Sequence, residues 1–306
     1  ATLGDATGDI PLNGPRAAAA GLDGQVVIAD SSNHRIVVLD RDGNLVTTFG
    51  SYCDLELGEA GDCIDPDGTG PAELGDGQFY EPWGVAVDAL GNIYVADTWN
   101  ERIQVFDSQG NLLRKWGGQG ATNGELGDPY ALFGPRGIAL DNDGNLLVAD
   151  TGNKRIVIYS PEGELVDQFG GGGAIAGRFD EPTDVAVDPN DGSIYVADAW
   201  NQRVQKFNAD LSFANEWPIA TWEGLHHPRL PYLTVSGTGD LYVGDPAMYR
   251  VMVYDPNGNV KNSFGRYGAE GNQFALASGL ATDPSTGNIL VTDGESGRVL
   301  VYPPLP

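Results

Sequence analysis

Short apolar runs of about five residues follow one another along the whole chain, separated by a few polar residues. One representative stretch contains four of them: Gly84–Val87, Asn92–Ala96, Arg102–Phe106 and Leu112–Trp116. The turn sequences Ala89-Leu90-Gly91-Asn92 and Ser108-Gln109-Gly110-Asn111 hold Gly and Asn, which accept the positive φ of hairpin turns. No window shows a 3.6-residue apolar period of useful length, so the pattern predicts antiparallel strands and excludes a helical solenoid.

This four-strand unit recurs six times. Each copy carries an Asp at the end of its second strand and an Arg five residues later, at the start of the third. The six pairs are Asp30/Arg35, Asp97/Arg102, Asp150/Arg155, Asp198/Arg203, Asp245/Arg250 and Asp293/Arg298. A period near 48 residues, with one long insertion after the first copy, predicts an all-β fold, a six-bladed β-propeller of four-stranded antiparallel blades. We expect each pair to form a charge-assisted hydrogen bond that shapes its loop, and not to be catalytic.

The sixth repeat lacks a fourth strand, because its third run, Arg298–Tyr302, continues directly into Pro303. We expect the N-terminal Thr2-Leu3-Gly4 to supply the missing outer strand, which closes the ring and protects an open sheet edge. The sequence therefore predicts one propeller domain over residues 1–306. An acidic insertion at 51–79 lies between blades 1 and 2, and a Pro-rich tail at 303–306 is typical of a linker.

The six Asp-x4-Arg units resemble those of the NHL-repeat family of six-bladed propellers, and the resemblance covers nearly the whole chain. It implies the fold, and the extracytoplasmic bacterial or archaeal type of the family. The resemblance does not imply one function, since members of the family include RNA-binding domains, peptide-amidating lyases and extracellular adhesion modules. Function must therefore be argued from the site.

The net charge of −26, with 43 acidic and 17 basic residues, excludes whole classes of partner. Binding of nucleic acid by a basic face needs clustered Lys and Arg, and so does docking on an anionic membrane surface. No apolar run approaches the ~18 residues of a membrane-spanning helix, so direct membrane insertion is not expected.

Two cysteines, Cys53 and Cys63, lie ten residues apart in the acidic insertion. Their closeness in a loop-like setting predicts a disulfide, which indicates an extracellular, cell-surface or periplasmic location. A reduced pair in a cytosolic loop is the alternative.

The first strand of each blade lines the central channel, and its alternate positions are nearly all Ala or Gly. Asp184 and Tyr232 break this rule, and Arg16, Trp83 and Arg136 stand at neighbouring positions at the channel mouth. One acid, two arginines and two aromatics around one opening are suited to a ligand site. The alternative is structural: Asp184 pairs with Arg136 or caps a turn.

The loops that join strands two and three lie at the same end of the propeller as this mouth; we call this end the loop face. Trp99 and Trp200 occupy the same repeat position on it, and Trp222, His226 and His227 lie in the connection into blade 5. Aromatic rings on loops stack on sugars or contact a partner's side chains, unless they cover each other over a small core.

The insertion holds eight acidic residues and no basic one. Asp62, Asp65 and Asp67 precede Gly68, and closely spaced carboxylates before a Gly turn provide the oxygen ligands that Ca²⁺ takes. We expect no other cofactor. The alternative is a solvated acidic loop held by the disulfide.

These observations favour an extracytoplasmic binding propeller, part of a larger surface or membrane-attached protein, whose partner is a protein or a glycan on the loop face. The alternative is a metal-dependent lyase or hydrolase at the channel mouth, in which Asp184, Tyr232 and His226 or His227 act. A purely architectural spacer is the third hypothesis.

Overall fold

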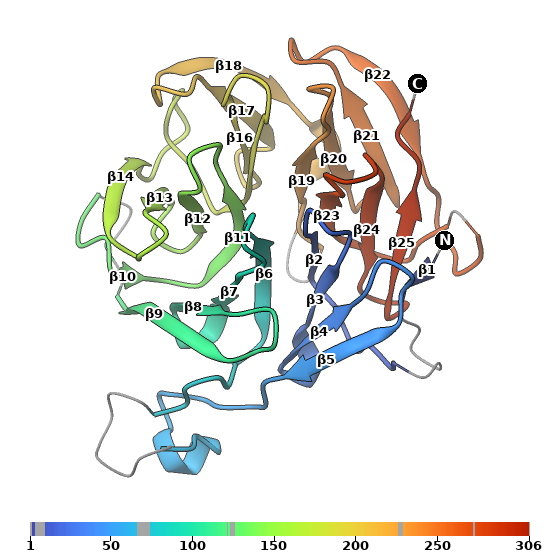
Figure 1. The fold of residues 1–306 in the computed structure, drawn as a ribbon. Coiled ribbons are helices and arrows are strands. Elements are labelled where there is room, and N and C mark those ends of the chain that lie inside the picture. Colours follow the sequence, from blue (N-terminus) through green and yellow to red (C-terminus); the bar gives the residue numbers. More distant parts are fainter. Residues whose placement is uncertain are drawn as a thin grey trace.

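The computed structural model describes residues 2–3, 10–65, 74–120, 122, 126–225, 229–271 and 273–305. Its strands form six antiparallel blades around a central channel (Figure 1), as the repeat predicts. Each innermost strand packs against the innermost strands of both neighbouring blades. Among the described residues, no helix is long and apolar enough to cross a membrane.

The strands of each blade run from the channel outward. Blade 1 consists of β2 (Ala17–Ala20), β3 (Val26–Asp30), β4 (Arg35–Leu39) and β5 (Leu45–Phe49). Blade 2 consists of β6 (Pro82–Val87), β7 (Ile93–Asp97), β8 (Arg102–Phe106) and β9 (Leu112–Gln119), with the short β10 (Ala131–Leu132) parallel to β9. Blade 3 consists of β11 (Pro135–Leu140), β12 (Leu146–Asp150), β13 (Arg155–Tyr159) and β14 (Leu165–Gly170).

The second half of the ring repeats this order. Blade 4 consists of β15 (Pro182–Val187), β16 (Ile194–Asp198), β17 (Arg203–Phe207) and β18 (Phe213–Pro218). Blade 5 consists of β19 (Leu233–Val235), β20 (Leu241–Asp245), β21 (Arg250–Tyr254) and β22 (Val260–Phe264). Blade 6 consists of β23 (Ala277–Thr282), β24 (Ile289–Asp293), β25 (Arg298–Tyr302) and β1 (Thr2–Leu3). The described residues also form four short 3-10 turns: η1 (Ser31–Asn33), η2 (Gly58–Gly61), η3 (Thr98–Asn100) and η4 (Ala220–Trp222).

The N-terminal strand closes the ring. Thr2 pairs with Leu300 and Leu3 with Val299 in an antiparallel ladder, so the chain's first strand is the outer strand of its last blade. This confirms the closure predicted from the missing fourth strand of the sixth repeat.

The hydrophobic core consists of layers between neighbouring blades. Between blades 2 and 3, for example, Tyr94 and Trp116 pack against Val148 and Tyr159. The second strand of every blade is buried along its whole length, because blades cover both of its faces. This explains why the second strands are continuous apolar runs rather than alternating ones.

The six Asp–Arg pairs are structural. In each blade the Arg Nε atom lies 2.7–3.2 Å from the Asp Oδ2 atom. In blade 2 the other oxygen of Asp97 accepts a hydrogen bond from the backbone N–H of Tyr80, which precedes the blade's first strand. In blades 1, 2, 3, 4 and 6 the buried Asp therefore ties the entry of its blade to the loop between strands two and three, where charged partners and backbone donors offset the cost of burial. In blade 5 the Oδ1 atom of Asp245 has no hydrogen-bond partner among the described residues.

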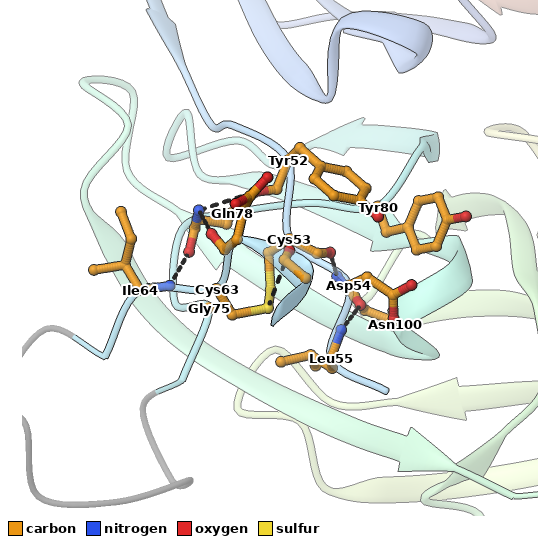
Figure 2. Close-up of a disulfide and its surroundings, with 12 residues drawn as sticks. Tyr52, Cys53, Asp54, Leu55, Cys63, Ile64, Gly75, Gln78, Tyr80 and Asn100 are labelled. Atoms are coloured by element: carbon orange, nitrogen blue, oxygen red, sulfur yellow. Dashed lines mark hydrogen bonds between the residues drawn. A yellow bond between two sulfur atoms is a disulfide. The ribbon is translucent and has the colours of Figure 1, made fainter. Parts of the chain in front are cut away.

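The insertion between β5 and β6 folds beside the loop face of blade 2. The predicted disulfide joins Cys53 to Cys63, whose Cα atoms are 4.6 Å apart. The Gln78 side chain bonds to the backbone on both sides of it, at Tyr52 and Ile64 (Figure 2). The described parts of the insertion, residues 51–65 and 74–79, thus have their own internal hydrogen bonds.

Candidate functional site

The central channel contains a cavity of about 410 Å³. Small residues of the innermost strands form most of its wall, and the cavity extends to the turns at Pro189, Gly237 and Pro284 at the end opposite the loop face. Trp83, Asp184 and Tyr232 also line it. The predicted exceptions to the Ala and Gly rule are therefore gathered in one place.

Asp184 is buried and linked to backbone on two blades. Its Oδ1 atom accepts a hydrogen bond from the Val185 N–H at 2.9 Å, and its Oδ2 atom accepts one from the Leu233 N–H at 2.7 Å. Burial raises the pKa of this carboxyl to about 7, although both hydrogen bonds act to lower it. A Cβ on Gly137 would lie 1.9 Å from Oδ1, so glycine is required there. Asp184 links blades 4 and 5 through these two backbone groups, and no ion pair joins it to Arg136 among the described residues.

A cluster of aromatic and basic side chains closes the loop-face end of the cavity. We call it the mouth cluster; its members are Arg16, Trp83, Arg136, Leu230 and Tyr232. The guanidinium carbons of Arg16 and Arg136 lie 4.7 and 4.9 Å from the Trp83 ring centroid, within the range of cation–π attraction. Trp83 packs with Leu230 and Tyr232 in a small apolar cluster. The expected mouth is therefore filled by side chains, with Trp83 between the cavity and the guanidinium groups.

Arg136 and Tyr232 keep unused hydrogen-bond donors. Among the described residues, Arg136 Nε and Nη1 and the Tyr232 hydroxyl are buried without a hydrogen-bond acceptor. The nearest carboxylate to Arg136, that of Glu181, is 3.9 Å from Nη1. Burial lowers the pKa of Arg136 and raises that of Tyr232 to about 12, while the nearby guanidinium groups lower the Tyr232 value. Buried donors without acceptors cost free energy, which an anionic group could recover.

Trp99 and Trp200 lie on the loop face with 40% and 52% of their surface exposed. The Trp99 indole donates a hydrogen bond to Glu81 at 3.0 Å and meets the Trp83 ring edge to face, with 6.2 Å between centroids. Trp99 therefore connects the mouth cluster to the exposed surface.

Trp222 is placed differently from the expectation. It is 1% exposed, its indole donates to the Gly244 carbonyl, and it packs in the core between blades 4 and 5. Its large apolar ring fills that core, so it does not belong to the exposed surface. His226 and His227, expected beside it, lie outside the described residues.

The structure describes two of the three aspartates that the sequence predicts as calcium ligands. Asp62 and Asp65 are described, and Asp67 lies outside the described residues. Within the described ranges, no group of three or more His, Cys, Asp or Glu side chains gathers closely enough to hold a metal ion. A calcium site in the insertion stays a prediction.

A second cavity, of about 430 Å³, lies between the insertion and blade 2. Its wall includes Glu101, a carboxyl that the sequence analysis did not single out. The sequence carried one signal: Glu101 is the only acidic residue directly preceding the Arg of a repeat.

The repeats match a known family model. The NHL repeat model matches residues 12–48, 79–106, 134–159, 179–207 and 274–302. Blade 5, whose copy of the motif is one of the weaker ones, lies between the last two matches.

Curated relatives share parts of the chain. The protein brain tumor of Drosophila melanogaster is 34% identical over 144 residues, which cover 46% of this chain and 13% of that protein. The peptidylglycine alpha-amidating monooxygenase of Rattus norvegicus is 31% identical over 210 residues, which cover 62% of this chain and 21% of the enzyme. The matches thus span about a fifth or less of these two relatives.

A solved structure of a nidogen/laminin complex contains a similar chain. The TM-score is 0.58 at 22% sequence identity, and the match covers 83% of this chain and 81% of that one. This likeness shows the fold. With the repeat match, the paired Asp and Arg residues and the closed ring of blades, the protein is a six-bladed β-propeller of the NHL-repeat family.

Proposed function

We propose that the protein is an extracytoplasmic binding propeller whose loop face holds a protein or glycan partner by an anionic group. The observation that carries this proposal is Arg136. It keeps two buried donors without acceptors among the described residues, beside a second arginine and the unused Tyr232 hydroxyl.

The charge of the whole molecule makes this cluster unusual. In a chain with 43 acidic and 17 basic residues, basic side chains easily find carboxylates, and the arginines of the repeat units do so. The Arg136 Nη1 atom lies 3.9 Å from Glu181, and the charge of Arg16 acts to lower the pKa of Arg136. An incoming anion would relieve the repulsion between these two guanidinium groups. A carboxylate of an acidic side chain or of a uronic acid would satisfy the donors bidentately.

Trp99 and Trp200 would enlarge the contact surface around this group. Exposed indoles provide flat apolar area for a sugar ring or a side chain at small cost in conformational entropy. The disulfide supports the extracytoplasmic location, because disulfides persist in oxidising compartments. The similar chain in the nidogen/laminin complex supports a protein partner over a glycan.

The test is a titration with two anionic probes, glucuronate and N-acetylglutamate methylamide, read at the Trp83 indole ¹⁵N–¹H signal. We expect saturable shifts in the wild type and at least tenfold weaker binding in Arg136→Gln. Arg41→Gln is the matched control, since the Arg41 guanidinium group is exposed and donates to the Asp23 carbonyl. Equal binding by Arg136→Gln and wild type, or no shift with either probe, would overturn the proposal.

A second candidate is a lyase or hydrolase that uses the channel cavity. The observation in its favour is that Asp184, with a pKa near 7, and Tyr232 both line this cavity, since a group that titrates near neutral pH suits acid–base chemistry. Against it, both Asp184 oxygens already accept backbone hydrogen bonds. If the protein, purified without chelator, holds no stoichiometric transition metal and takes up none on addition, the metal-dependent version is excluded.

A further inference from the structure

The cavity between the insertion and blade 2 has the composition of a pocket for a long basic side chain. Its wall combines apolar surface from Leu55, Leu74, Trp99 and Trp116 with carboxylates from Glu56 and Glu101. The apolar surface suits a methylene chain, and the carboxylates suit the cation at its end. We call this cavity the Glu101 pocket.

Glu101 is the unusual group in this pocket. It is 6% exposed, and no donor among the described residues bonds to its buried Oε2 atom. Burial is the largest cause that raises its pKa to about 7, and the charges of Glu56 and Asp150 act in the same direction. A hydrogen bond from the Gly120 backbone acts in the opposite direction. A buried carboxylate without a cationic partner is unfavourable and gains most from an incoming cation.

The basic residues of the pocket do not neutralise Glu101. The Arg102 Nε atom donates to Asp97 at 2.8 Å, and Lys115 forms an ion pair with Asp76. The ion pairs of the described residues include neither Glu56 nor Glu101 as a partner of a basic side chain. The charge left in the pocket is therefore negative.

The repeat itself shows that the fold does not require this carboxyl. The residue before the Arg has φ between 52° and 62° in all six repeats: His34, Glu101, Lys154, Gln202, Tyr249 and Gly297. The same left-handed position accepts Gln in blade 4, so an acid is not needed for the backbone. Only in blade 2 is the position acidic, and there it is also buried.

The insertion places the carboxylate of Glu56 in the same pocket as that of Glu101. Asn100 accepts a hydrogen bond from the Leu55 N–H at 3.0 Å and donates to the Cys53 carbonyl at 2.9 Å (Figure 2). The Gln119 amide donates to Glu56 Oε1 at 2.7 Å. The disulfide-linked segment is thus fastened to the loop that carries Glu101, and it places Glu56 in the same pocket.

We propose that the Glu101 pocket binds a lysine or arginine side chain of a protein partner, with Glu101 and Glu56 contacting the cation. This rests on the proposed binding function and names the partner's chemistry. Proteins are the common source of a cation at the end of an apolar chain, so the pocket selects a protein over a glycan. Two carboxylates are too few for calcium, which takes six to eight oxygen ligands.

The test uses N-acetyl-lysine methylamide, N-acetyl-arginine methylamide and the uncharged N-acetyl-norleucine methylamide, read at the indole signals of Trp99 and Trp116. At pH 8 we expect the two basic probes to shift both signals and norleucine to shift neither. Glu101→Gln should weaken binding at least tenfold, and Glu223→Gln, which removes an exposed acid elsewhere, should leave it unchanged. Glu101→Gln copies the residue of blade 4, and its thermal melt checks that it folds.

The pH dependence gives an independent readout. The ionisable groups around Glu101 are Glu56 of the insertion, Asp150 of blade 3, and Arg102 and Lys115 with their acidic partners. Affinity for the lysine probe should fall at least fivefold between pH 8 and pH 5.5 in the wild type, and stay flat in Glu101→Gln.

Three results would overturn the proposal: equal shifts with norleucine, undiminished binding by Glu101→Gln, or shifts of the same signals by calcium alone that depend on Glu101. The response of Trp83 to glucuronate separates the two proposals. If it persists while the lysine probe fails to bind, only the Glu101 pocket is refuted.

Discussion

Blades 2 and 4 present nearly the same loop to the loop face, yet both candidate binding clusters include side chains of blade 2: Trp83 in the mouth cluster and Glu101 in the Glu101 pocket. The shared residues are Asp97, Trp99, Asn100, Arg102 and Gln104 in blade 2, and Asp198, Trp200, Asn201, Arg203 and Gln205 in blade 4. In both blades the Asn, Arg and Gln side chains bond to the Asp.

The two blades differ in the partners of the shared Asn and in the second residue of the first strand. Asn100 bonds to Cys53 of the insertion, whereas Asn201 bonds to Gly173 of a short connection. Blade 2 has Trp83 at the start of its first strand, where blade 4 has Thr183, whose hydroxyl donates to the Pro231 carbonyl. The shared Asp, Asn, Arg and Gln side chains maintain the fold, and the proposed binding chemistry comes from the differing residues together with the loop tryptophans.

The largest loss of stability should come from replacing the Asp that both loops share. Asp97→Ala and Asp198→Ala each remove the buried carboxylate that accepts hydrogen bonds from the Arg, Asn and Gln side chains of its loop, and each should lower the free energy of unfolding by about 3–5 kcal/mol. Urea unfolding measures both. A loss in one blade but not in the other would show that the two loops are not energetically equivalent.

Removing the disulfide should affect the loop of blade 2 and leave the loop of blade 4 unchanged. The Cys53→Ser/Cys63→Ser variant should destabilise the insertion by about 2–3 kcal/mol, as expected for a short closed loop. Hydrogen exchange should therefore quicken around Leu55 and Asn100 and stay unchanged around Asn201. Quickened exchange in both blades would contradict a local role for the insertion.

Exchanging Glu101 and Gln202, the residues that precede Arg102 and Arg203, should change stability by a smaller amount that depends on pH. The pKa of Glu101 is raised from 4.5 to about 7, so the folded state holds this proton more tightly than the unfolded state. Stability from the protonated carboxyl is present below pH 4.5 and is lost as the pH rises to 7.

Glu101→Gln should accordingly be more stable than the wild type at pH 8, by about 1–2 kcal/mol after allowance for solvent screening. Gln202→Glu, at a half-buried position, should change stability by less than about 0.5 kcal/mol. Thermal melts at pH 5 and pH 8 compare the two. A wild type that gains stability between these pH values relative to Glu101→Gln would refute the assigned shift.

The smallest effect concerns the two loop tryptophans. Trp99→Ala removes the bond to Glu81 and the contact with Trp83, and should cost about 1 kcal/mol. Trp200→Ala, at a more exposed ring, should cost less than about 0.5 kcal/mol. Equal losses would indicate that Trp99 is not held by the mouth cluster.

The fold could be predicted because its signals are local and repeated. The Asp-x4-Arg units, the hairpin turns and the missing sixth outer strand each lie within a few residues of one another. The short parallel strand β10 carried no such repeat, and it escaped the sequence analysis.

The site could be predicted only in part, because burial depends on contacts distant in sequence. Trp222 looks like a loop aromatic until the blade 5 core is seen around it. The partners of Asp184 are backbone N–H groups, one of them 49 residues away. Since every residue except Pro has such a group, no residue pattern predicts these contacts. The loop of Glu101 accepts a hydrogen bond from Leu55 of the insertion through Asn100, across 45 residues of sequence, and no local pattern indicates this contact.

The central claim is that binding takes place on the loop face around blade 2 and not inside the channel. Backbone amide shifts of the whole protein, recorded with glucuronate and N-acetyl-lysine methylamide together, test it directly. We predict that the largest shifts fall on residues around Arg16, Trp83, Trp99, Glu101 and Arg136. Shifts concentrated at Pro189, Gly237 and Pro284 near the opposite end of the channel cavity would contradict the claim.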